Sequence, residues 1–98
     1  MASANWTPSA VGDMEEIAYW IAEKDQRPET ARRIVEEMKA EAQRFAKIPH
    51  AGQRHPDIRE DWLYFRFKRW LIFYRIIDEG IDVLRVIDSA RDFPRLFG

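Results

Sequence analysis

The chain has 98 residues, a length for one domain, and 46% of them are apolar, including four Trp, six Phe and three Tyr. It contains no cysteine, which excludes disulfides, thiolate catalysis and thiolate metal sites. A net charge of −1 argues against binding nucleic acid through bulk electrostatics, and no apolar run approaches the roughly 20 residues of a membrane span. We therefore expect one soluble, cytoplasmic domain over residues 1–98 that binds neither membranes nor, by itself, nucleic acid.

Two helices are predicted in the first half of the chain. Thr7 can cap the first helix with Pro8 at its first position, and apolar residues at three- and four-residue spacing continue it over residues 8–23. The second helix begins at Pro28 and covers residues 28–47, where the apolar stripe is the clearest periodicity in the sequence. Because only residues 24–27 separate them, the two helices should form an antiparallel hairpin whose stripes face the same layer.

The second half is rich in β-branched and aromatic residues and predicts strands. Residues 48–61 contain Pro49, Gly52 and Pro56, which is typical of a loop. Strands are expected over residues 62–68, 70–77 and 81–87, with a turn at residues 78–80 and a short first strand at residues 5–6. The predicted fold class is α+β: the helix hairpin packs on one face of a small, mainly antiparallel sheet of about four strands, whose other face is open.

The alternation of side chains along residues 70–77 predicts which of them reach the open face. The side chains toward the helices should be Ile72, Tyr74 and Ile76, and those toward the open face should be Leu71, Phe73, Arg75 and Ile77. A turn centred on Glu79 would pair Arg75 with Val83. The same turn would pair Phe73 with Arg85, which makes the two arginines neighbours on one face. A charge among apolar neighbours is costly unless solvent or a partner meets it, so we favour a partner there.

Other charged and titratable residues are weaker candidates for a site. Residues 62–77 contain no acid and carry a local charge of +4, from Arg66, Lys68, Arg69 and Arg75. Arg66, Lys68 and Arg69 are equally consistent with a role in solubility and protection of a sheet edge and with binding to an anionic target. Asp13, Glu15 and Glu16 are assigned to the helix dipole. His50 and His55 lie in a loop without a third ligand at metal spacing, so we expect no metal and no cofactor.

Five short motifs in the same order resemble the ParE branch of the ParE/RelE toxin superfamily. They are Trp-Thr-Pro at residues 6–8 with the acidic run at 13–16, Ile-Pro-His-Ala-Gly at 48–52, Leu-Ile-Phe-Tyr-Arg at 71–75, Val-Leu-Arg-Val at 83–86, and Ala-Arg-Asp at 90–92. Each motif alone is weak. Together they span about 90 residues and support one assignment.

The resemblance implies the toxin of a type II toxin–antitoxin system, neutralised by a ParD-like antitoxin in a hetero-oligomer and inhibiting DNA gyrase by protein–protein binding. A disordered acidic and apolar antitoxin segment would cross the open sheet face as a helix or added strand. The predicted antitoxin-binding residues are Leu71, Phe73, Arg75, Val83 and Arg85. The predicted target- or anion-binding residues are Arg66, Lys68, Arg69 and Arg91.

The alternative within the same superfamily is a ribosome-dependent messenger RNA endonuclease of the RelE type. That chemistry needs a base, an acid and cations around the phosphate, and relatives supply Tyr or His near the C-terminus. Residues 88–98 contain neither, and Leu63 stands where relatives often carry arginine. We therefore name no catalytic residue and favour gyrase inhibition, while the enzyme question and the nuclease alternative stay open.

Overall fold

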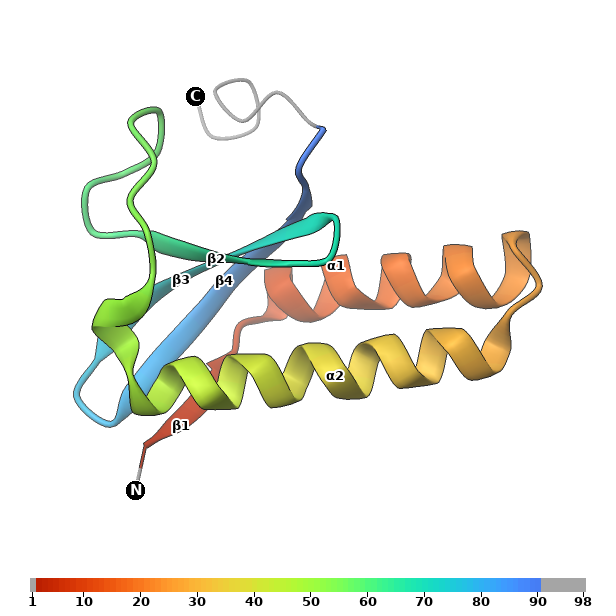
Figure 1. The fold of residues 1–98 in the computed structure, drawn as a ribbon, viewed down its shortest axis with the longest axis horizontal. Helices are drawn as coiled ribbons and strands as arrows, with labels where there is room; N and C mark the ends of the chain where they lie inside the picture. The colour runs from red at the N-terminus through yellow and green to blue at the C-terminus, as the bar shows by residue number, and fades with distance from the viewer. Residues whose placement is uncertain (1, 91–98) are drawn as a thin grey trace.

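The computed structural model describes residues 2–90, in which two helices cover one face of a four-stranded sheet (Figure 1). Helix α1 (Pro8–Tyr19) begins as predicted, because the Thr7 hydroxyl accepts the Ala10 N–H at 3.3 Å and Pro8 follows it. It continues into a π-helical turn, η1 (Trp20–Lys24). Helix α2 (Pro28–Lys47) has the predicted bounds. The two run side by side in opposite directions, so the expected arrangement of the helices is confirmed.

The sheet has the order β1-β4-β3-β2. Its strands are β1 (Ser3–Trp6), β2 (Leu63–Phe67), β3 (Trp70–Ile77) and β4 (Gly80–Asp88). Strand β1 runs parallel to β4, and the other two pairs are antiparallel. The predicted α+β class and the mainly antiparallel sheet of four strands are therefore confirmed, with the first strand longer than the sequence indicated.

The register of β3 against β4 differs from the prediction. The two strands join through a two-residue turn that places Ile77 opposite Gly80, so Arg75 lies opposite Asp82 instead of Val83. A bulge between Phe73 and Tyr74 inserts one extra residue in β4, and beyond it Phe73 lies opposite Arg85 as predicted. The predicted Arg75–Val83 pair is wrong because the turn between the two strands is one residue shorter than predicted. The bulge restores the predicted register only beyond Tyr74.

The two faces of the sheet carry separate apolar clusters. Ile72, Tyr74 and Ile76 pack with α1 and α2, as the alternation predicted. On the other face, Leu71 and Phe73 pack with Ile58 and with the half-buried Trp62. The second face is therefore covered by the segment of residues 53–62, and the expectation that it is open is wrong. Residues 2–90 include no helix long and apolar enough to cross a bilayer.

Tyr74 fixes the chain after α2 to the sheet. Its side chain is fully buried, and its hydroxyl donates to the Pro49 carbonyl at 2.6 Å, which holds the 3₁₀ turn η2 (Pro49–Ala51). A Cβ on Gly52 would collide with the same hydroxyl, so only glycine lets the loop pass this close. Burial raises the pKa of Tyr74 above its ordinary value of 10.0, because the phenolate would lose its water.

We expect Tyr74→Phe to lower the free energy of unfolding by about 1–2 kcal/mol at pH 7, because it leaves the Pro49 carbonyl without its donor. The raised pKa means that the folded state favours the neutral phenol. This contribution is complete below pH 10 and is lost as the pH rises above it, so the variant should lose less stability than the parent in that range. Urea unfolding at pH 7 and above pH 10 measures both effects.

The matched control is Tyr64→Phe, which removes a hydroxyl whose 3.2 Å hydrogen bond to Gln53 lies at the surface. It should change the free energy of unfolding by less than about 0.5 kcal/mol. Equal losses in the two variants would show that the Tyr74 hydroxyl does not anchor the loop.

Candidate partner-binding groove

A groove of about 430 Å³ lies between the helix layer and the end of the sheet, and we call it the α1–β4 groove. Its apolar lining consists of Ile17, Trp20 and Ile21 on the helix side and Trp70, Val86 and Ile87 on the sheet side. Its charged lining consists of Asp13, Glu16, Asp25, Arg69, Arg85 and Asp88. An apolar wall bordered by charged groups can receive another chain, whose apolar side chains it buries and whose charges it pairs.

The groove exists because β1 covers only half of β4. Strand β1 pairs with Gly80 to Val83, and among residues 2–90 no strand pairs with that edge of β4 beyond Val83. There the chain turns into α1: the Thr7 N–H donates to the Val83 carbonyl at 3.1 Å, and its hydroxyl donates to the same oxygen at 2.8 Å. The helix therefore runs beside a strand edge with which no strand of residues 2–90 pairs.

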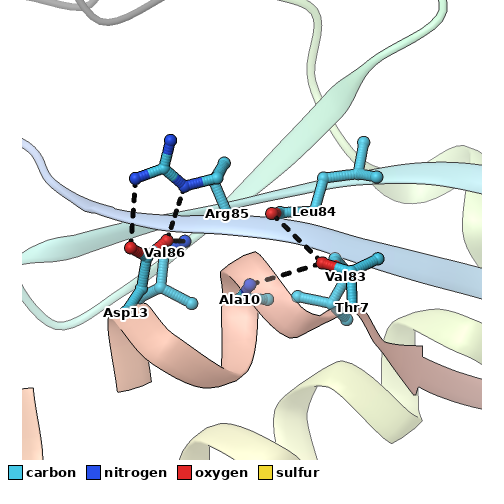
Figure 2. Close-up of polar contacts among 7 residues, drawn as sticks. All are labelled: Thr7, Ala10, Asp13, Val83, Leu84, Arg85 and Val86. Atoms are coloured by element: carbon cyan, nitrogen blue, oxygen red, sulfur yellow. Dashed lines mark hydrogen bonds and ion pairs between the residues drawn. The ribbon is translucent and has the colours of Figure 1, made fainter. Parts of the chain in front are cut away.

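Asp13 binds that edge from α1 (Figure 2). Its carboxylate accepts from Arg85 Nε at 2.7 Å, from Arg85 Nη2 at 3.1 Å and from the Val86 backbone N–H at 2.9 Å. The Asp13 and Arg85 side chains are 18% and 31% exposed, and the hydrogen bond to Asp13 raises the pKa of Arg85. The assignment of Asp13 to the helix dipole is wrong, because this carboxylate joins α1 to a strand 72 residues away.

The predicted antitoxin-binding residues lie in four different places. Leu71 is 7% exposed and Phe73 is fully buried, so neither can act as an open apolar seat. Val83 is fully buried in the helix-facing core. Arg75 is half exposed and contacts Asp82 at 3.2 Å, whereas Arg85 contacts Asp13. Of the five, only Arg85 lines the α1–β4 groove, and the predicted pair of free arginines does not form.

Three of the four predicted target- or anion-binding residues also have partners. Arg69 pairs with Asp88 at 2.5 Å, and Lys68 lies 3.7 Å from Glu37. Arg66 donates to the Lys68 carbonyl at 3.0 Å. Arg91 lies outside the described residues. Exposed ion pairs of this kind stabilise the folded state by only about 0–1 kcal/mol, so a carboxylate of a bound partner can replace the acid of this chain in them.

The sequence interpretation missed Trp20. Its side chain is 53% exposed, one of three large apolar side chains exposed among residues 2–90, and it forms part of the groove wall. The available signal was its spacing, because Trp20 does not fall on the stripe of Ala10, Met14, Ile17 and Ile21. A tryptophan off the buried stripe of an amphipathic helix indicates an exposed aromatic ring.

The model of the ParE toxin of the type II toxin–antitoxin system parDE matches residues 4–93. This chain belongs to the ParE toxin family. Every residue that lines the α1–β4 groove lies inside the matched range. The predicted membership of this family, and with it the toxin class, is confirmed.

The ParE fold is also found by comparison with solved structures. A chain of the chromosomal ParDE toxin–antitoxin system from P. aeruginosa superimposes with a TM-score of 0.72 at 19% identity, and the match covers 90% of this chain and 96% of that one. At this identity the likeness shows the fold alone. A search of curated proteins gives no match.

The ParE fold places Leu63 in the core. Its side chain is 8% exposed and packs with the helix-facing cluster, so this position lies on no accessible face. Among residues 2–90 no group of three or more His, Asp or Glu residues is placed to hold a metal ion. The expectation of no metal and no cofactor stays a prediction.

Proposed function

We propose that this ParE-family chain inhibits DNA gyrase by binding to it, and that a ParD-like antitoxin neutralises it by filling the α1–β4 groove. The observation that carries the antitoxin site is the exposed Trp20 in the apolar wall of the groove. A disordered segment gains from burying its apolar side chains against apolar walls, because it must offset its own ordering entropy. The apolar wall of the groove offers that burial.

This site replaces the sheet face that the sequence favoured. There, Ile58 and Trp62 already cover Leu71 and Phe73, so a partner would first have to displace the segment of residues 53–62. The α1–β4 groove needs no such rearrangement. Of the predicted arginines, Arg85 remains at the interface and Arg75 moves outside it.

The pairing of the arginine side chains favours inhibition by binding over RNA cleavage. Arg69, Arg75 and Arg85 each contact a carboxylate of the same chain, which offsets the charge that a scissile phosphate would need. The sequence after Asp88 adds no Tyr or His that could transfer a proton. A toxin that acts by binding requires neither group.

Two purified targets separate the two functions. We expect the chain to inhibit supercoiling of relaxed plasmid by gyrase, and to leave a messenger RNA on programmed ribosomes uncut. Antitoxin added in equimolar amount before gyrase should restore supercoiling, which serves as the control for specific inhibition. Cleavage of the message in the ribosomal A site, together with normal supercoiling, would replace the gyrase assignment by the nuclease alternative.

A further inference from the structure

The charges in the α1–β4 groove are not balanced. Each of its two arginines contacts one acid of the groove, Arg85 with Asp13 and Arg69 with Asp88. The remaining acids, Glu16 and Asp25, are exposed and form no ion pair with any residue from 2 to 90. Charged side chains of the groove that still lack a partner of opposite sign are therefore acidic.

These two carboxylates border the apolar wall. Glu16 lies one helical turn before Trp20, on the same face of α1 and η1. Asp25 follows η1 directly and lines the groove from the end of the helix. A chain seated against Ile17 and Trp20 would therefore pass both carboxylates.

The exposed indole also accepts a cation. The Lys24 ammonium lies 5.5 Å from the centroid of the Trp20 ring. A lysine or arginine of a bound chain can use the same kind of contact. Lys24 offsets part of the local charge, but it does not line the groove, whereas both free carboxylates do.

We infer that the segment which fills the α1–β4 groove is apolar and basic, with at least one lysine or arginine directed to Glu16 and Asp25. This inference rests on the proposed function, which places the antitoxin there, and it reverses the acidic character first expected of that segment. An acidic segment would bring like charges together in a partly desolvated site, which is costly. A basic one pairs both carboxylates and associates faster at low salt.

The test measures the affinity of the purified chain for its antitoxin, the ParD-like protein encoded beside it, by calorimetry. Glu16→Lys and Asp25→Lys should each weaken binding about tenfold, and the double variant should bind with a smaller dependence on salt than the parent. The matched control is Glu15→Lys, which makes the same charge change on the neighbouring exposed position outside the groove. It should bind as the parent does.

Trp20→Ala separates this inference from the proposed site. It should weaken binding about thirtyfold or more if the groove is the interface, because a tryptophan in an apolar site is a typical hot spot. If Trp20→Ala weakens binding while both lysine variants bind as tightly as the parent or more tightly, the bound segment is not basic, but the groove is still the antitoxin site. Unchanged affinity in all three variants would remove the antitoxin from the groove altogether. Thermal unfolding of each variant confirms that it is folded.

Discussion

Replacing Gly80 with alanine is expected to lower the free energy of unfolding by about 3 kcal/mol. Gly80 begins β4 at φ 138°, in a region that other residues rarely adopt. A Cβ there would collide with the backbone of Ser3, because β1 pairs with β4 at this point. The backbone of β1 cannot move aside without losing its hydrogen bonds to β4. Backbone strain and lost strand pairing therefore both lower the stability of the variant. Urea unfolding of the parent and the variant measures the difference.

Gly12→Ala is the matched control for this substitution. Gly12 lies within α1, and a Cβ there would meet no atom within 4 Å. Alanine should therefore stabilise the chain by about 0.5–1 kcal/mol, because it loses less conformational freedom in a helix than glycine does. Similar stability changes for the two variants, in sign or size, would contradict the role assigned to Gly80.

The second large effect is expected for Asp13→Ala, at about 2–3 kcal/mol of unfolding free energy. The change removes three hydrogen bonds, two of them from the Arg85 guanidinium, and leaves the Val86 N–H without an acceptor in a partly buried site. Arg85 keeps some contact with water, which holds the loss below that of a fully buried charge. Urea unfolding at neutral pH provides the measurement.

A double-mutant cycle with Arg85→Ala isolates the pair. The sum of the losses in unfolding free energy of the two single variants should exceed the loss in the double variant by about 1 kcal/mol or more, since each single change leaves one partner unsatisfied. Glu16→Ala, three residues along α1 and without an ion pair among the described residues, is the control and should stay within about 0.5 kcal/mol of the parent. An Asp13→Ala variant as stable as that control would show that the contact does not join α1 to β4.

The parts of the fold that the sequence predicted best depend on local signals. Pro8 and Pro28 each begin a helix as predicted, Pro8 behind its cap Thr7, and α2 has the predicted bounds because its apolar stripe repeats over 20 residues. The strands β2, β3 and β4 lie within one residue of their predicted ends, since aromatic and β-branched runs bounded by turn residues define them. Local periodicity was sufficient for the fold class.

The site could not be predicted in the same way, because its geometry depends on contacts between distant residues. The register of β3 against β4 follows from how the two strands and their turn fit together: the two-residue turn places Asp82, not Val83, opposite Arg75, and the bulge then places Arg85 opposite Phe73. Nothing near Asp13 in the sequence indicates that its carboxylate reaches Val86. The cover over Phe73 comes from a loop whose composition predicts only irregular structure.

The position of β4 has a consequence for synthesis of the toxin. This strand is the last of the described chain, yet it lies between β1 and β3, so Ser3 has no partner until Gly80 has been made. A nascent chain that lacks β4 also lacks Arg85 and the Val86 and Ile87 side chains of the groove. Such non-local pairing forms late, because the chain between the strands must first be ordered. Closure of the sheet, and with it completion of the α1–β4 groove, therefore waits until residues 80–88 have been made.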